Sequence, residues 1–149
     1  MPRIDARTNV YAAWPTGYKA WKRLSDQVYA SGLEARLLYL VMVRASQVNG
    51  CAYCLEMHAR EAREAGEEQR RLDVLAGWRD VPWFDERERA ALALTEAVTE
   101  VGQAHVPDEV VDEALRCFGG EDFAKLLLAI VVINGWNRIN VTARVAPAE

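Results

Sequence analysis

The sequence is organised around the stretch Asn49–His58 (NGCAYCLEMH), which holds two of the three cysteines and one of the two histidines. Its leading Asn-Gly pair favours a turn, because both residues tolerate positive φ. The residues that follow are mostly good helix formers, which predicts a helix with Cys51 in its first turn. Steps of three and four residues then place Cys51, Cys54 and His58 on one helix face.

This pattern suits the redox chemistry of a dithiol. The backbone N–H groups and the partial positive charge at a helix N-terminus favour a thiolate over a thiol. An imidazole one turn away can accept the thiol proton. Two neighbouring thiols can close a disulfide after one of them has been oxidised. The stretch therefore predicts a reactive cysteine, a resolving cysteine and a base.

Length and composition limit the remaining possibilities. A chain of 149 residues predicts a single domain over 1–149, and 51% apolar residues suffice for a core. A net charge of −4 argues against a nucleic-acid-binding face, which needs clustered basic residues. The longest apolar run, Leu126–Ile133, is far shorter than the roughly 20 residues that span a bilayer, and the N-terminus lacks the apolar centre of a signal peptide. We therefore expect a cytoplasmic protein without nucleic-acid or membrane partners, where a Cys-x-x-Cys pair is typically catalytic or metal-binding.

Helical signals occur along almost the whole chain. Helices are predicted over Pro15–Tyr29, Glu34–Val48, 51–65, 67–76, about 86–101, 107–118 and about 122–141. No segment shows a period-two alternation bounded by turn residues, so no sheet is expected. The fold class is therefore all-α, a compact bundle of about seven helices. The second helix is apolar on most sides, which predicts burial in a core or an interface.

Other uses of the cysteine pair fit less well. A structural zinc site needs four ligands, and the spacing of His105 and Cys117 does not recommend either as the fourth. A thioredoxin-type motif would follow a strand, and a c-type haem site would need histidine where Leu55 stands. Two buried core cysteines are the remaining structural interpretation. No metal or cofactor is expected.

The residues also resemble a known family. Ser46–Cys54 together with His58 is similar to the signature of alkylhydroperoxidase D-like (AhpD-like) proteins of the carboxymuconolactone decarboxylase superfamily. The resemblance extends from about Gly32 to Val141 and is to the single-domain branch. Its further landmarks are Ala62–Glu67, Arg71-Leu72, Trp78-Arg79, Glu86–Ala90, Thr95–Val98, Val106–Asp108 and Ile133–Arg138.

The resemblance implies an all-helical homo-oligomer, a hexamer or otherwise a trimer, with cofactor-free peroxidase activity on hydrogen peroxide or organic hydroperoxides. In that family one thiolate attacks the O–O bond and becomes a sulfenic acid, and the second thiol condenses with it to a disulfide. An external dithiol, a lipoyl-protein or a thioredoxin-like protein, then reduces the pair. The histidine helps to deprotonate the cysteine, and a glutamate supports the histidine. Lactone decarboxylation belongs to members without the cysteine pair and is not expected here.

One position departs from the family pattern. The glutamate that lies twelve residues before the first cysteine is Tyr39 in this chain, and tyrosine is neutral near pH 7. Glu34 lies five residues away, about 140° around a helix, and cannot replace it. Either another carboxylate supports the histidine, with Glu96 and Glu56 as candidates, or the proton relay is weakened. A weakened relay would favour the alternative function, a redox-sensing or disulfide-exchange protein with little peroxidase turnover.

The sequence leaves two arguments about which cysteine attacks. Cys51 is nearer the helix N-terminus, which favours a low pKa for its thiol. Cys54 is one turn from His58, and a positioned base gives both proton transfer and orientation. We therefore expect Cys54 to attack the peroxide and Cys51 to resolve the sulfenic acid.

Overall fold

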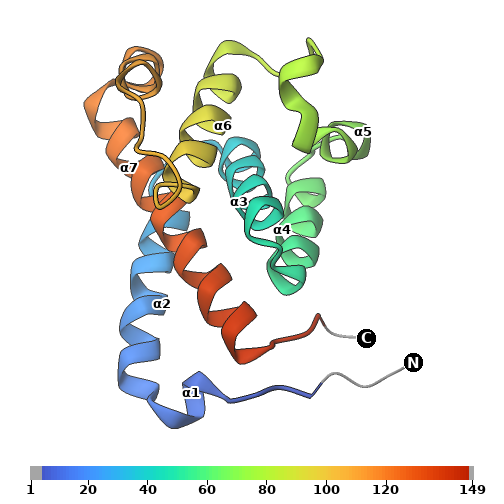
Figure 1. Cartoon of the computed structure of the whole chain (residues 1–149), viewed down its shortest axis with the longest axis vertical. Helices are drawn as coiled ribbons and strands as arrows, with labels where there is room; N and C mark the ends of the chain where they lie inside the picture. The colour runs from blue at the N-terminus through green and yellow to red at the C-terminus, as the bar shows by residue number, and fades with distance from the viewer. Residues whose placement is uncertain (1–4, 148–149) are drawn as a thin grey trace.

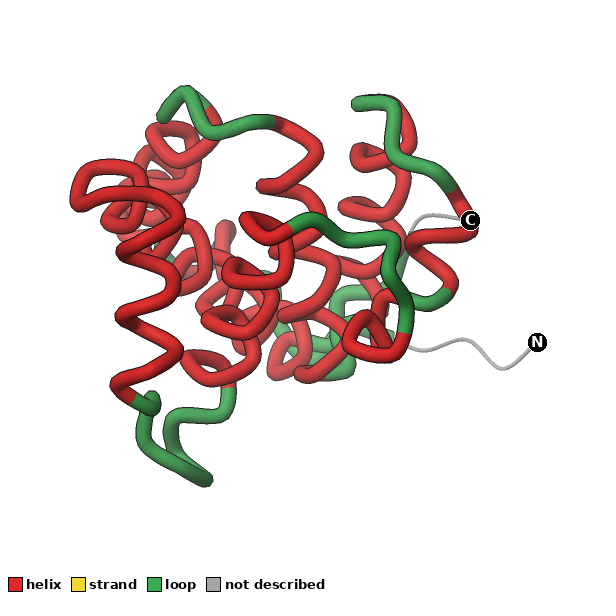
Figure 2. The backbone as a smooth tube through the Cα atoms, turned by 90° about the horizontal axis from the view of Figure 1, so that it is seen from above, coloured by secondary structure: helices red, strands yellow, loops and turns green. Residues whose placement is uncertain are grey.

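The computed structural model describes residues 5–147, which form seven α-helices and one 3₁₀ helix (Figure 1). In chain order these are α1 (Val10–Ala13), α2 (Pro15–Tyr29), α3 (Ala35–Asn49), α4 (Ala52–Glu64), α5 (Gln69–Asp73), the 3₁₀ helix η1 (Leu75–Asp80), α6 (Glu86–Thr99) and α7 (Asp108–Ala143). Figure 2 shows these helices joined by short loops, without a strand in the described range. The predicted all-α class is confirmed.

Helix α3 is the centre of the bundle and packs against α4, α6 and α7 (Figure 1). Its apolar side chains point in several directions and enter three separate hydrophobic clusters. Leu40, Val41 and Met42, three consecutive residues, are essentially inaccessible to solvent. Each such side chain stabilises the fold by ~1.5–3 kcal/mol relative to an exposed one. The predicted burial of the second long helix is therefore confirmed.

The connection from α3 to α4 is a tight turn at the predicted Asn-Gly pair. Gly50 ends α3 in the left-handed conformation with φ of 65°, which glycine adopts without steric cost. The N–H of Cys51 then donates to the carbonyl of Ser46 (3.1 Å). Cys51 is the N-cap of α4 and not a residue of its first turn, because the helix begins at Ala52, one residue later than predicted. The turn thus fixes the end of α3 and the start of α4 together.

Several predicted boundaries differ from the structure. The two helices expected over 107–118 and 122–141 form one element, α7, interrupted only at Gly119, whose φ is 71°. A single left-handed glycine changes the helix direction without a loop. The expected helix over 67–76 is instead the short α5 followed by η1, and the N-terminal helix α1 was not predicted.

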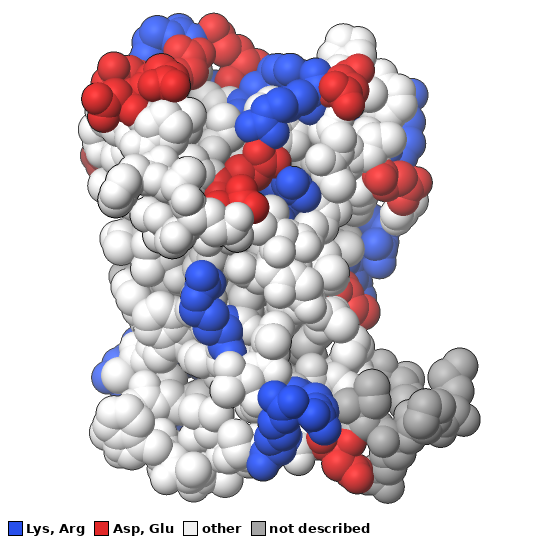
Figure 3. Space-filling view, in the orientation of Figure 1, with Lys and Arg blue, Asp and Glu red and all other residues white. Residues whose placement is uncertain are grey.

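The surface is uneven in charge. In Figure 3 charged side chains of both signs gather at the upper end, around α5 and the starts of α6 and α7, whereas the middle of this face is largely uncharged. Two apolar side chains one turn apart on α7, Leu128 and Val131, are exposed. The predicted homo-oligomer would cover such residues, and it stays a prediction. None of the helices within residues 5–147 is long and apolar enough to cross a membrane.

Close packing of α2 on α7 gives a test of the fold. A Cβ atom added to Gly135 would lie 2.2 Å from Cζ2 of Trp21. We expect Gly135→Ala to lower the free energy of unfolding by about 1–3 kcal/mol, because the indole must shift within a packed core. Urea unfolding of the purified protein measures this change.

The matched control is Gly120→Ala in the same helix, where an added Cβ meets no atom within 4 Å. Alanine is a better helix former than glycine by about 1 kcal/mol, so this variant should be as stable as the wild type or more so. Equal urea midpoints for the two variants would contradict the packing argument.

Candidate redox site

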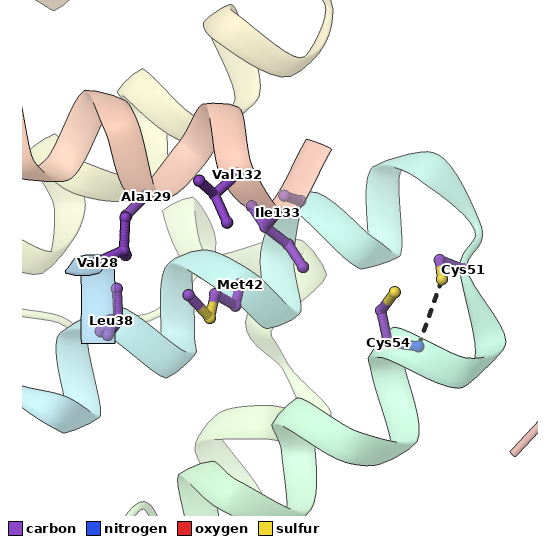
Figure 4. Close-up of a cluster of buried hydrophobic side chains, with 9 residues drawn as sticks. Val28, Leu38, Met42, Cys51, Cys54, Ala129, Val132 and Ile133 are labelled. Carbon is purple, nitrogen blue, oxygen red and sulfur yellow. Dashed lines mark hydrogen bonds between the residues drawn. The ribbon is translucent and has the colours of Figure 1, made fainter. Parts of the chain in front are cut away.

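The two thiols of the motif meet at the N-terminus of α4. The N–H of Cys54 donates to Sγ of Cys51 (3.3 Å), so a sulfur atom takes the place of the usual N-cap oxygen (Figure 4). Cys51 is 1% exposed and Cys54 is 0% exposed, and neither forms a disulfide. Figure 4 shows both beside the core cluster that contains Met42 and Ile133. The pair is therefore held rigidly and away from bulk solvent.

The environment polarises this pair. A hydrogen bond from the Cys51 thiol lowers the pKa of Cys54 from its usual 9.0 to about 6, and it outweighs the opposing effect of burial. Asn140 adds a hydrogen bond from its Nδ2 to Sγ of Cys54 (3.4 Å), Asn137 adds another, and the positive charge of His58 contributes further. The same shared proton, together with burial, raises the pKa of Cys51. Both shifts favour the thiolate form for Cys54 and the thiol form for Cys51.

The imidazole of His58 follows one turn later and is only 2% exposed. Its Nδ1 lies 2.8 Å from Oε2 of Glu61, which is partly exposed. The ring of Tyr39 stacks on the imidazole with centroids 6.4 Å apart. Tyr39 therefore reaches the histidine as an aromatic neighbour, while the carboxylate partner comes from the same helix as the histidine.

Glu61 is the site residue that the sequence interpretation missed. Both carboxylates suggested from sequence are engaged elsewhere: Glu96 accepts from Nε of Arg44 (2.8 Å), and Glu56 pairs with Arg60 on the surface. The signal was available, because a glutamate three residues after a histidine lies next to it on a helix. It was hidden among the many charged residues of the exposed face of α4.

Three asparagines of α7 extend the polar environment of the site. Asn134, Asn137 and Asn140 follow at intervals of three residues and so lie along one side of the helix. Nδ2 of Asn49 donates to Oδ1 of both Asn134 (3.0 Å) and Asn137 (2.9 Å), and Nδ2 of Asn137 donates to Oγ of Ser46 (3.0 Å). This network joins the end of α3 to α7 directly behind the cysteines.

A cavity of about 640 Å³ lies against this site. Glu61, the partner of His58, and Asn140, which donates to the sulfur of Cys54, both line it. The neighbouring lining residues Tyr53 and Met57 come from the same helix as the cysteines. Through Glu61 and Asn140 the cavity adjoins Cys54 and His58, which do not line it themselves.

The remaining histidine and cysteine stand apart from the site. His105 is exposed in the loop before α7, and Cys117 lies on α7 with its Sγ 3.8 Å from Oε1 of Glu113. Within residues 5–147 no three side chains of His, Cys, Asp or Glu are grouped as a metal site would require. We therefore assign no metal ligands.

Sequence comparison agrees with this architecture. Residues 15–97 match the model of the carboxymuconolactone decarboxylase family. The uncharacterised protein YdfG of Bacillus subtilis (strain 168) is 33% identical over 138 residues, which cover 93% of this chain and 94% of YdfG. A sequence relationship of this extent, on top of an all-helical fold with a Cys-x-x-Cys-x-x-x-His run, defines the class as AhpD-like.

Solved structures give the same picture. One solved structure is a protein of unknown function from Agrobacterium tumefaciens that has been related to the antioxidant defence protein AhpD. It superposes with a TM-score of 0.92 at 38% identity, over 97% of this chain and 100% of that one. The debrominase Bmp8 superposes with a TM-score of 0.82 at 22% identity, over 92% of this chain and 74% of Bmp8, and shares the fold. The chain belongs to the carboxymuconolactone decarboxylase family, as one of its AhpD-like members.

The polarised pair predicts an unusual titration. In the wild type, ultraviolet thiolate absorbance should rise with a midpoint near pH 6, because Cys54 ionises there. Since this pKa is lower than that of an unfolded cysteine, the ionised Cys54 stabilises the fold above the unfolded pKa, and this contribution is lost as the pH falls through about 6. Cys51→Ala should move the midpoint upward, because the donated hydrogen bond is removed.

Cys117→Ala is the matched control, because Cys117 lies away from the pair. Burial is the chief cause that raises the pKa of Cys117. This variant should leave the low midpoint in place. A low midpoint that persists in Cys54→Ala would show that the thiolate is not on Cys54.

Proposed function

We propose that the protein is a thiol-dependent peroxidase that reduces hydrogen peroxide or organic hydroperoxides, with Cys54 as nucleophile, Cys51 as resolving thiol and His58 as base. The observation that carries the proposal is the geometry around one buried pair: Cys51 caps α4, and Asn140 donates to the sulfur of Cys54. His58, paired with Glu61, follows one helical turn later. The directions of the two pKa shifts, lowered for Cys54 and raised for Cys51, agree with this geometry. The thiolate is the nucleophilic form of cysteine. A structural pair of core cysteines gains nothing from such polarisation.

The chemistry balances with these groups and one external reductant. The Cys54 thiolate attacks the terminal oxygen of the hydroperoxide, the O–O bond breaks, and the alkoxide or hydroxide leaves with a proton from the imidazolium of His58. Cys54 is then a sulfenic acid. The sulfur of Cys51 attacks it, a disulfide forms, and water leaves with the proton that His58 takes from Cys51. A dithiol reductant, of the lipoyl or thioredoxin-like kind, returns two electrons and two protons.

The His58–Glu61 pair gives this cycle its proton carrier. With Nδ1–H directed to the carboxylate of Glu61, Nε2 is the ring nitrogen left to exchange the proton. The carboxylate also fixes the orientation and the tautomer of the ring. Glu61 is partly exposed and lines the cavity, so its carboxylate lies between the buried ring of His58 and the cavity.

The alternative, a redox-sensing or disulfide-exchange protein, depends on a missing carboxylate at Tyr39. Glu61 occupies the position next to His58 that this alternative assumes to be empty. A supported histidine favours turnover over simple disulfide formation. The two functions differ in one measurable quantity, steady-state consumption of peroxide.

The first experiment measures peroxide consumption with dithiothreitol as reductant, together with mass spectrometry of the Cys51–Cys54 pair. Cys54→Ser should abolish turnover, because no nucleophile remains. Cys51→Ser should form a sulfenic acid at Cys54 that dimedone traps, because the resolving thiol is absent. Cys117→Ser, the control, should retain wild-type turnover.

Two results would reject the proposal. Undiminished turnover in Cys54→Ser would remove the assigned nucleophile. Complete formation of the disulfide in the wild type, without steady-state consumption of peroxide, would favour the redox-sensing or disulfide-exchange function instead.

The role of Glu61 is tested by Glu61→Gln. The amide keeps the size of the side chain and loses its charge, so kcat should fall by roughly ten- to hundred-fold, a substantial part of what a positioned proton carrier supplies. Glu56→Gln, on the exposed side of the same helix, should behave like the wild type. Equal kcat values for the two variants would exclude Glu61 from the relay.

A further inference from the structure

The cavity beside the redox site is far larger than the smallest peroxide requires. Its volume is about 640 Å³, whereas a molecule the size of water occupies about 30 Å³ of liquid. Cavities of roughly 300–1,000 Å³ are typical of sites for organic ligands. The dimensions alone therefore indicate a substrate with a substantial organic group.

Aromatic rings form much of the cavity wall. Tyr18 makes edge-to-face contacts with Tyr11 and with Trp136, each with centroids 5.3 Å apart. Nε1 of Trp136 donates to Oγ of Ser25 (3.2 Å), which fixes the orientation of the indole. Fixed aromatic rings bind other rings in stacked or edge-to-face geometry, worth ~0.5–1.5 kcal/mol beyond area burial.

The two ends of the chain complete the wall. The N–H of Arg7 donates to the carbonyl of Ala143 (2.9 Å), and the N–H of Val145 donates to the carbonyl of Asn140 (2.9 Å). Figure 1 shows the described N-terminal segment running beside the C-terminal end of α7. Residues of the segment before α1 and of the segment after α7, among them Ala6 and Val145, therefore belong to the cavity lining.

Cys54 and His58 do not line this cavity themselves, but a hydrogen-bond partner of each does. Asn140 lines it and donates to the sulfur of Cys54, and Glu61 lines it and pairs with His58. An organic group bound among the aromatic rings would therefore present its hydroperoxide beside Asn140, next to the thiolate. The alcohol released on cleavage of the O–O bond keeps the same organic group and would occupy the same place.

We infer that this cavity is the substrate site and that it selects hydroperoxides carrying an aromatic ring, as in an arylalkyl hydroperoxide, over hydrogen peroxide and small aliphatic hydroperoxides. This inference rests on the proposed function and names its substrate class. The aromatic group binds against Tyr18, Tyr53 and Trp136, and the hydroperoxide group lies toward Asn140 and Glu61.

The test compares kcat/KM for cumene hydroperoxide, tert-butyl hydroperoxide and hydrogen peroxide in the wild-type protein. These substrates share the reacting bond and differ in the attached group. The phenyl ring should raise kcat/KM for cumene hydroperoxide at least about tenfold over the tert-butyl compound, because burying an added apolar group in a fitting site gives discrimination of that order. Equal values for the three would overturn the inference.

Variants of lining residues test whether the substrate preference arises in the cavity. Tyr18→Ala and Met57→Ala remove lining side chains from two different helices. Each should lower the preference for cumene over tert-butyl hydroperoxide, mainly through KM. Trp83→Leu is the control, because Trp83 is an exposed aromatic outside the cavity, and it should keep the wild-type preference. A preference unchanged in both lining variants, with native circular dichroism, would also overturn the inference.

A binding measurement separates this inference from the proposed function. The alcohol product 2-phenyl-2-propanol contains no peroxide, so its binding to the reduced wild-type protein needs no turnover. It should quench tryptophan fluorescence saturably, and Tyr18→Ala should weaken that binding. Binding of the alcohol without consumption of any peroxide would overturn the peroxidase and keep the aromatic site. Consumption of peroxides without alcohol binding or selectivity would keep the peroxidase and overturn the aromatic site.

Discussion

The hydrogen bond between Cys51 and Cys54 is the interaction on which the site depends. Its geometry follows from the position of Cys51 as the N-cap of α4. The sulfur of Cys51 accepts the backbone N–H of Cys54, and the thiol proton of Cys51 remains available for the sulfur of Cys54. The left-handed Gly50 allows the chain to enter this position immediately after α3. A longer connection would leave the N-cap free to move and would separate the two sulfurs.

The core keeps this arrangement in place. Helix α3 ends at the turn, and its burial on several sides fixes where the turn lies. The asparagine network from Asn49 to Asn137 and Ser46 joins the same end to α7, which also supplies Asn140 to the Cys54 sulfur. Burial alone would raise the pKa of a thiol. The lowered pKa of Cys54 therefore requires these donors to be held at fixed positions.

The features set by local residue type were predictable from the sequence. The Asn-Gly turn, the cysteine helix and the buried α3 each have a signal within a few residues. The continuity of α7 could not be predicted in this way, because Gly119-Gly120 is equally typical of a loop and of a left-handed kink within a helix. The partner of His58 was also missed, since Glu61 looks like one more charge on a solvated face unless the burial of the histidine is known. The cavity needs both ends of the chain and has no local signal.

The polarised pair also orders the steps of the proposed cycle. The pKa of Cys51 is raised chiefly because its proton is shared with the negatively charged sulfur of Cys54. Conversion of Cys54 to a neutral sulfenic acid removes that charge, and the pKa of Cys51 must then fall toward the value set by burial and by its remaining hydrogen bonds. In the proposed cycle this change favours attack by Cys51 after Cys54 has reacted. Because the two sulfurs already adjoin, the disulfide can form before a second peroxide oxidises the sulfenic acid further.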